Sequence, residues 1–182
     1  MIFNFQNIDK ELKPGIEILK DELKFQTGIE GFPVFVNQNQ SELCVNFSNE
    51  NAKIEYQKKS HFFRALGHLA DKCKKNDFAG VKEIMQFESL GCMIDVSRNA
   101  VMKPLMIKKF INKLALMGYQ FLMLYSEDTY TVDGEPYFGY LRGRYSHDEI
   151  NEIDNYADIF GIELIPCIQT LAHLRSFLKW DC

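Results

Sequence analysis

The sequence lacks two features that would point directly to a partner: an excess of basic residues and a long apolar run. Its 21 lysines and arginines are outnumbered by 25 aspartates and glutamates, so the 182 residues carry a formal net charge of −4. Nucleic-acid-binding domains are usually basic, because they must neutralise phosphates. No stretch approaches the roughly 20 apolar residues that a membrane-spanning helix needs. We therefore expect neither nucleic acid nor a membrane as a partner.

Cysteine and histidine lack the spacing of redox pairs and metal sites. The five cysteines include no CxxC pair, and an odd number cannot form a complete set of disulfides within the chain, so we expect buried thiols. The first 15 residues lack the basic segment and apolar core of a secretory signal, and together with the thiols this predicts a cytoplasmic protein of the bacterial type. Three of the four histidines, His61, His68 and His147, have no metal-ligand spacing with acids or cysteines. We expect no metal and no other cofactor.

The amino-terminal half predicts a small α+β domain over residues 1–88. Apolar residues at helical spacing indicate a helix that begins near Pro14 and ends at Phe25. Turn residues separate the segments that follow, and the expected elements are strands at 32–38, 42–49, 52–57 and 81–87 and a second helix at 60–74. Because no low-complexity stretch follows, we expect residues 87–90 to form a closely packed boundary.

From Gly91 the chain alternates between buried strands and amphipathic helices. We expect strands near 91–95, 119–128 and 162–169, with helices at 103–117 and 146–160. The second helix carries a capping signal, Ser146 followed by Glu149, and Gly161 suits the left-handed position after it. This order predicts an α/β fold with parallel strands and right-handed crossovers. Topology alone fits either an open doubly wound sheet or the beginning of a closed barrel.

Charged residues stand where these strands end. Asp95 and Arg98 follow the first strand, and Glu127 and Asp128 end the second. Loops after the carboxyl ends of parallel strands build the active sites of α/β folds. We therefore expect Arg98, Glu127 and Asp128 to project toward one shared face.

Four segments resemble, in order, the start of the catalytic barrel of glycoside hydrolase family 20, the β-N-acetylhexosaminidases: GCMIDVSRN, LALMGYQFLMLYSED, NEIDNYADIFGIELIP and the following His173. DVSR is the most specific piece. The preceding tract ENAKIEYQKKSHFFRALGHLADKC is similar to the small α+β domain before that barrel. The resemblance implies that residues 89–182 form the first three strands of a truncated (β/α)8 TIM barrel, because a whole barrel takes about 250 residues.

The resemblance implies roles for the residues at the strand ends. Arg98 matches an arginine that holds hydroxyls of the terminal sugar; a salt bridge to the aspartate three residues earlier is the alternative. Glu127 and Asp128 resemble an acidic pair that orders the pocket, or they form a solvated turn. His173 aligns with a histidine that orients the acidic machinery, or it is a satisfied core residue. Gln169 replaces a carboxylate that is common in the family and indicates a divergent subfamily.

A long aromatic and basic loop, TYTVDGEPYFGYLRGRY, follows the second of these strands. Aromatic rings stack on sugar rings, and arginines bind hydroxyls or anions. The loop either lines a carbohydrate cleft or packs on itself, and the sequence favours neither. The candidates for the cleft are Tyr130, Tyr137, Tyr140, Arg142 and Arg144.

The resemblance also implies a reaction. Family members release terminal N-acetylglucosamine or N-acetylgalactosamine by substrate-assisted retaining catalysis, in which a glutamate acts as acid and base and the adjacent aspartate steers the substrate's acetamido group. That pair follows the fourth barrel strand, whereas this chain ends after the third. The two Asp-Glu pairs in the chain, at 21–22 and 148–149, lie in predicted helices. We therefore expect no catalytic residue here, and a fragment that is inactive alone.

Three functions from different classes stay open. The favoured one is the amino-terminal portion of an exo-β-N-acetylhexosaminidase, whose partner is a carbohydrate with a terminal N-acetylhexosamine. The second is a non-catalytic carbohydrate-binding module, and the third is a structural or interaction domain with an unrelated doubly wound fold. A truncated barrel leaves sheet edges and an apolar inner surface uncovered, so we also expect the isolated chain to self-associate.

Overall fold

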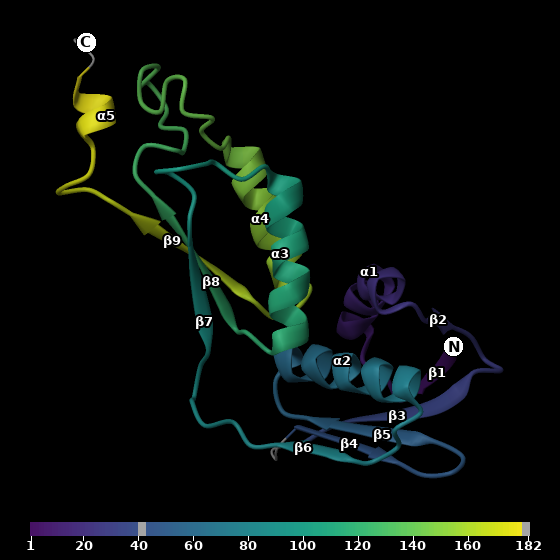
Figure 1. The fold of residues 1–182 in the computed structure, drawn as a ribbon. Coiled ribbons are helices and arrows are strands. Elements are labelled where there is room, and N and C mark those ends of the chain that lie inside the picture. Colours follow the sequence, from purple (N-terminus) through teal and green to yellow (C-terminus); the bar gives the residue numbers. More distant parts are fainter. Residues whose placement is uncertain (40–42, 180–182) are drawn as a thin grey trace. The chain divides into compact units, whose positions relative to one another are not determined.

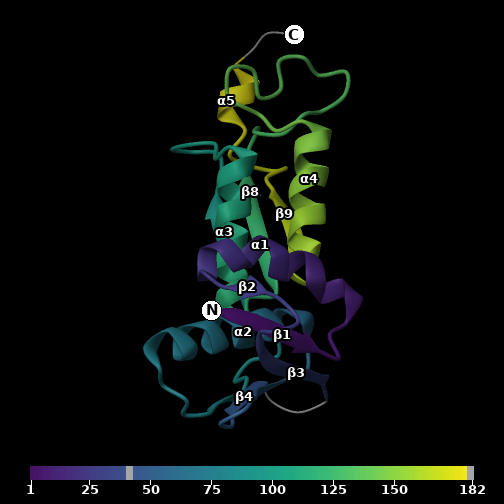
Figure 2. The same cartoon turned by 90° about the vertical axis from the view of Figure 1, so that its right-hand side faces the viewer.

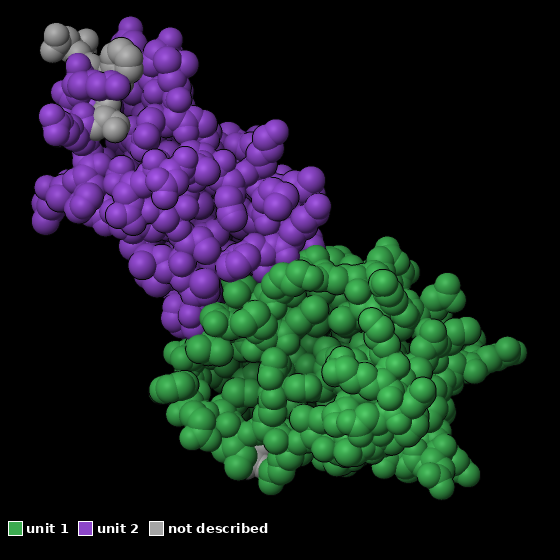
Figure 3. Space-filling view, viewed as in Figure 1, with its two compact units in different colours: residues 1–90, 112–120, 159–161 green, residues 91–111, 121–158, 162–182 purple. Residues whose placement is uncertain are grey.

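The computed structural model describes residues 1–39 and 43–179, and the chain divides into two compact units (Figure 3). The first unit contains residues 1–90, 112–120 and 159–161, and the second contains the rest of the chain from Gly91 on. This division differs from the contiguous boundary expected between residues 88 and 89. Leu116 explains part of the difference, because its carbonyl accepts a hydrogen bond from Arg64 and its side chain lies beside Gly67.

Six strands form one sheet in the first unit, in the order β2-β1-β3-β5-β4-β6. Strands β2, β1, β3 and β5 run parallel to one another, whereas β4 is antiparallel to both β5 and β6. The strands are β1 (Ile2–Gln6), β2 (Gln26–Thr27), β3 (Phe32–Gln38), β4 (Leu43–Phe47), β5 (Ala52–Tyr56) and β6 (Val81–Glu83).

Two helices, α1 (Lys13–Leu23) and α2 (Lys59–Lys75), cover one face of this sheet (Figures 1 and 2). A short 3-10 helix, η1 (Lys10–Leu12), precedes α1. Alternate strand residues enter the core beneath the helices, as a half-buried strand requires. The core residues include Phe3, Val34, Ile54, Leu19 and Leu66, all 1% exposed or less.

The predicted elements of this unit are confirmed in large part, with two corrections. Strands β1 and β2 were not expected, because β1 pairs with β3, which lies further along the chain, and β2 has only two residues. The prediction of a closely packed boundary at residues 87–90 is wrong, since Phe87 is 72% exposed and Leu90 is 39% exposed. Apolar character alone could not tell that no helix or strand in the described part of the chain covers these two side chains.

Three parallel strands form the sheet of the second unit, in the order β7-β8-β9. The strands are β7 (Gly91–Asp95), β8 (Phe121–Ser126) and β9 (Glu163–Ile168). The helices are α3 (Pro104–Met117), of which residues up to 111 belong to this unit, α4 (His147–Asp158) and the short α5 (Arg175–Leu178). Every strand and both long helices lie within two residues of their expected positions.

The capping signal of α4 acts as predicted. The Oγ of Ser146 accepts a hydrogen bond from the Glu149 amide at 3.2 Å, and the Glu149 carboxylate accepts one from the Ser146 amide at 2.9 Å. This reciprocal pair satisfies two amide groups that the helix itself cannot. After the helix, Gly161 takes a φ of +69°, the left-handed conformation that glycine adopts at least cost.

The two faces of the β7-β8-β9 sheet differ in cover. Leu122 and Leu124 lie on the face under α3 and α4 and are 0% and 3% exposed. Met93, Met123 and Ile165 stand in register on the opposite face, along which Figures 1 and 2 show no helix in the described part of the chain. There the side chain of Met93 is 56% exposed. The sheet therefore presents one partly exposed apolar face.

Candidate functional site

The acidic pair after β8 is buried and held by an arginine from the following loop. Glu127 is 8% exposed and Asp128 is 1% exposed. Arg142 Nε donates to Asp128 Oδ1 at 3.0 Å, and Arg142 Nη2 donates to the carbonyl of Ser97 at 2.8 Å and lies 3.7 Å from Glu127 Oε2. One guanidinium thus joins the segment after β8 to the segment after β7. The alternative of a solvated turn for Glu127 and Asp128 is wrong.

Asp95 organises the turn that follows β7. Its Oδ1 accepts hydrogen bonds from the Ser97 amide and hydroxyl, both at 2.9 Å, and from the Arg98 amide at 3.2 Å, while its Oδ2 pairs with Arg98 Nε. Partial burial opposes the charge of Asp95, but these hydrogen bonds outweigh it and lower its pKa to about 2. The DVSR segment is therefore a compact, charged turn.

Arg98 is held in place while remaining accessible. Its guanidinium carbon lies 4.9 Å from the centroid of the Tyr125 ring, and the Asp95 carboxylate raises its pKa further above the usual value. Its side chain is 59% exposed. The salt bridge that formed the alternative to sugar binding is present, and it engages only Nε. Within the described part of the chain, no partner binds the two terminal nitrogens of Arg98.

The long loop after β8 packs largely on itself. The Tyr130 ring lies edge-on to Phe138 at 4.9 Å, and Arg144 donates to backbone carbonyls of the same loop, among them that of Pro136 at 3.3 Å. Tyr137 and Tyr140 form an edge-on pair at 6.0 Å and are 44% and 45% exposed. Of the predicted cleft candidates, these two tyrosines alone present exposed rings to solvent among the described residues of this loop.

The remaining two predicted site residues lie after β9. The backbone amide of Gln169 donates to the Ser126 carbonyl at 3.2 Å, which places Gln169 beside the end of β8. His173 is exposed and has a φ of +63°. No hydrogen bond or ion pair with a described residue connects His173 to Arg98, Glu127 or Asp128. The structure therefore brings together the residues after β7 and β8, without His173.

Sequence reasoning missed the positioning residues of this cluster. Tyr125, which supports Arg98, looked like an ordinary strand residue, although its register opposite Asp95 could have indicated the contact. Arg142 was one candidate for lining a cleft, and the structure shows it paired with the buried Asp128. Among the cysteines, Cys73 is buried as expected, whereas Cys44, Cys92 and Cys167 are only partly buried, and Cys182 lies outside the described residues.

The described residues provide neither a metal-binding cluster nor a membrane-spanning helix. In residues 1–39 and 43–179, no group of three or more His, Cys, Asp or Glu side chains is arranged to hold a metal ion. No helix within the same ranges is long and apolar enough to cross a membrane.

No protein-family model and no curated protein sequence matches the chain. Solved structures do match it. A glycoside hydrolase family 20 exo-β-N-acetylglucosaminidase from Vibrio harveyi, in complex with N-acetylglucosamine, aligns with a TM-score of 0.72 and 16% identity over 91% of this chain and 32% of its own. A mutant Streptomyces plicatus β-hexosaminidase in complex with N-acetylglucosamine gives 0.71 and 18% over 90% and 40%. A Bacteroides fragilis β-N-acetylhexosaminidase gives 0.68 and 14% over 91% and 39%.

The match covers nearly all of this chain, and the chain spans about a third to two fifths of the length of these enzymes. At such low identity the likeness concerns the fold. The chain has the mixed α/β fold of the amino-terminal part of glycoside hydrolase family 20 β-N-acetylhexosaminidases.

Proposed function

We propose that the chain is the amino-terminal portion of an exo-β-N-acetylhexosaminidase that releases terminal N-acetylglucosamine or N-acetylgalactosamine from glycans. The observation that carries the proposal is the match of both units to such enzymes, with Arg98 accessible at the carboxyl end of the first strand of the second unit. In this proposal β7, β8 and β9 are the first three strands of a (β/α)8 barrel. A cytoplasmic location belongs to the same proposal.

Arg98 is the residue that we assign to substrate binding. Asp95 engages Nε, and the Tyr125 ring supports the guanidinium, so the side chain is held in one orientation before any ligand arrives. The two terminal nitrogens are still available to donate to adjacent sugar hydroxyls. A preordered donor loses little conformational freedom on binding, which increases affinity. Asp128 and Arg142 keep the two strand ends together and position this turn through the Ser97 carbonyl.

The chemistry of the proposed enzyme requires groups beyond those of this chain. In substrate-assisted retaining hydrolysis the substrate's acetamido oxygen attacks the anomeric carbon, and a carboxylic acid protonates the departing oxygen. The Asp21-Glu22 pair lies in α1 and the Asp148-Glu149 pair in the first turn of α4, where Glu149 serves the helix cap. The proposal assigns no catalytic role to either pair. Arg98 contributes binding of the terminal sugar.

Hydrolysis of 4-nitrophenyl N-acetyl-β-D-glucosaminide tests the proposal. The purified 182-residue chain should give no turnover above buffer, whereas the natural polypeptide that contains it should hydrolyse the substrate. In that polypeptide Arg98→Ala should lower kcat/KM by roughly ten- to a hundredfold, the cost of lost charged hydrogen bonds to a sugar. Turnover by the 182-residue chain that a substitution within it abolishes would refute the division of roles.

A non-catalytic carbohydrate-binding module is the second candidate, favoured by the exposed rings of Tyr137 and Tyr140. It predicts binding of N-acetylglucosamine by the 182-residue chain without hydrolysis by any natural form of the protein. Isothermal titration of the chain with the sugar, alongside the hydrolysis assay on the natural polypeptide, separates the two candidates.

We also propose that the isolated chain self-associates through the sheet of the second unit. Within the described residues, β7 and β9 each have one edge without a strand partner, and Met93 is half exposed on the apolar face. Unpaired edges and exposed apolar surface favour association. Light scattering over a concentration series should reveal species larger than 21.2 kDa. A monomer at every concentration would contradict this proposal.

A further inference from the structure

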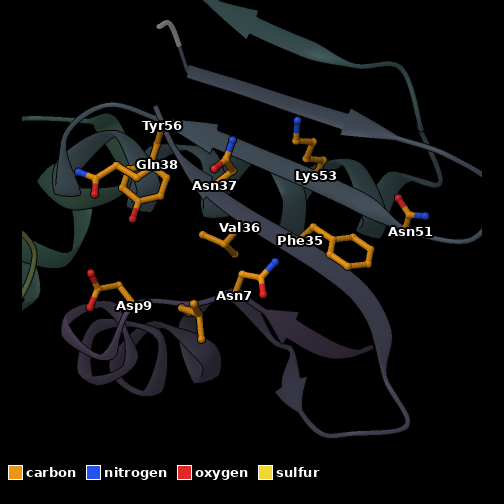
Figure 4. A pocket seen from close by; sticks show the side chains of 10 residues that line it. Asn7, Asp9, Phe35, Val36, Asn37, Gln38, Asn51, Lys53 and Tyr56 are labelled. Atoms are coloured by element: carbon orange, nitrogen blue, oxygen red, sulfur yellow. The ribbon is translucent and has the colours of Figure 1, made fainter. Parts of the chain in front are cut away.

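The first unit contains a hollow of about 620 Å³ at the carboxyl ends of its parallel strands (Figure 4). It is lined by Asn7–Asp9 directly after β1, by Phe35–Gln38 at the end of β3, and by Tyr56 at the end of β5 together with two residues near the start of that strand. We call it the strand-end hollow. Its volume lies within the usual range of small-molecule sites, about 300 to 1,000 Å³.

The topology of the sheet explains why the hollow forms at this place. Strands β1 and β3 are parallel neighbours, and their pairing ends at Gln6 and Phe35. After β1 the chain turns at Asn7, with a φ of +59°, and returns to the sheet on one side as β2. After β3 it returns on the other side as β4. Neighbouring parallel strands whose connections diverge leave a crevice at their carboxyl ends, the usual place for ligands in open α/β sheets.

The Tyr56 side chain brings a hydroxyl group to the hollow. Tyr56 is 4% exposed and lines the hollow, and its hydroxyl has no hydrogen-bond partner among residues 1–39 and 43–179. Burial, together with the charges of Asp9 and Glu11, raises the pKa of Tyr56 above its usual value, so the hydroxyl stays protonated at neutral pH. The hydroxyl therefore remains able to donate a hydrogen bond to a molecule in the hollow.

The other lining groups define the chemistry of the occupant. Figure 4 shows Asn7 and Asp9 across from Phe35, Val36 and Tyr56. The Asn7 amide has no hydrogen-bond partner among the described residues, so it offers both donors and an acceptor. Asp9 adds a charged acceptor. Val36 and the 41% exposed Phe35 add apolar surface.

The charges limit the class of ligand. Lys53, at the edge of the hollow, pairs with Glu55 at 2.8 Å. The described lining residues therefore provide no uncompensated positive charge that would bind a phosphate. Asp9 is the single carboxylate of the lining, which is too few for a divalent metal ion. Amide, hydroxyl and carboxylate groups beside apolar surface suit a neutral molecule with many hydroxyls and an apolar C–H face.

We infer that the strand-end hollow binds a sugar unit of a neutral oligosaccharide. In this assignment the Tyr56 hydroxyl donates to the sugar, Asp9 accepts from its hydroxyls, and the Asn7 amide does both. The site lies entirely in the first unit, whereas Arg98 lies in the second. The inference stands independently of the proposed hydrolytic function.

Nuclear magnetic resonance titration of the ¹⁵N-labelled 182-residue chain tests the inference. The probes are N,N′,N″-triacetylchitotriose, maltotriose and, as a charged comparison, ATP. At least one saccharide should shift the amide signals of Asn7 and Gln38. Tyr56→Phe removes one hydroxyl and should weaken binding about two- to tenfold, and Asp9→Asn should weaken it by a similar factor or more. Tyr119→Phe, at a tyrosine that does not line the hollow, is the matched control and should leave this binding unchanged.

Several results would overturn the inference. These are the absence of shifts at Asn7 and Gln38 with both saccharides, preferential binding of ATP, or equal affinity of Tyr56→Phe and Tyr119→Phe. Circular dichroism of each variant verifies the fold before titration. Signals that move only in the second unit would support sugar binding near Arg98 and contradict a site in the strand-end hollow, so the two proposals fail separately.

Discussion

Arg142 and Arg98 carry the same charge, but we expect only the removal of Arg142 to destabilise the fold. Arg142 binds Asp128, whose side chain is 2% exposed, while its own side chain is 28% exposed. Removal of one partner of a buried ion pair costs about 3–5 kcal/mol, because the other charge stays buried without compensation. The partial exposure of Arg142 admits some water. We expect Arg142→Ala to lower the free energy of unfolding by about 2–4 kcal/mol.

The Arg98→Ala variant should leave stability nearly unchanged. The Arg98 side chain is 59% exposed, and exposed ion pairs contribute little to stability. Asp95 would also keep its hydrogen bonds from the Ser97 amide and hydroxyl. Arg142→Lys provides an intermediate case, because a single ammonium group cannot bond Asp128 and the Ser97 carbonyl with the same fork.

Urea denaturation of the 182-residue chain, followed by circular dichroism, measures this contrast. The midpoint should fall clearly for Arg142→Ala, fall less for Arg142→Lys and stay within error of wild type for Arg98→Ala. If both alanine variants shift the midpoint equally, the assignment of Arg142 to structure and Arg98 to binding is refuted.

Three further predictions concern the first unit and the cap of α4. A methyl group at Gly15 would lie 2.3 Å from the buried Phe63 ring, so Gly15→Ala should destabilise the protein by about 1–2 kcal/mol. At Gly67 the atom nearest to such a methyl group is 3.4 Å away, so Gly67→Ala should stabilise the protein by up to about 1 kcal/mol. Thermal unfolding measures both effects. His61 is 2% exposed, and burial, assisted by the charge of Lys58, lowers its pKa below the usual 6.5 or so. The neutral form of His61 therefore stabilises the fold above about pH 6.5, and this contribution should be lost as the pH falls through the lower pKa of the folded state. His61→Gln should remove this pH dependence of stability in urea titrations. An unaltered pH dependence would contradict the assignment. Ser146→Ala should cost about 1 kcal/mol in the same assay, and no loss would show that the cap hydrogen bond contributes nothing.

The sequence predicted the elements whose signals are local. The helices at 103–117 and 146–160 have full amphipathic patterns, and the cap at Ser146 follows from two side chains three residues apart. Strand β1 escaped prediction because its five residues gain their role through pairing with β3, which follows about 30 residues later. Such pairing leaves no local signature in the sequence.

The candidate site was predicted in its residue types and less well in its contacts. The sequence predicted that Arg98, Glu127 and Asp128 follow the carboxyl ends of two parallel strands, and they lie at that end of the sheet. The sequence could not tell that Arg142 would return 14 residues later to bind Asp128, because a long loop has no fixed geometry. The strand-end hollow was not predicted either, because Asn7, Gln38 and Tyr56 come together only through the topology of the sheet.

Hydrolysis of 4-nitrophenyl N-acetyl-β-D-glucosaminide by the natural polypeptide that contains this chain is the most direct test of the central claim. The account predicts turnover that falls roughly ten- to a hundredfold in Arg98→Ala at unchanged stability. Absence of turnover in the natural polypeptide, or kinetics unaffected by Arg98→Ala, would contradict it.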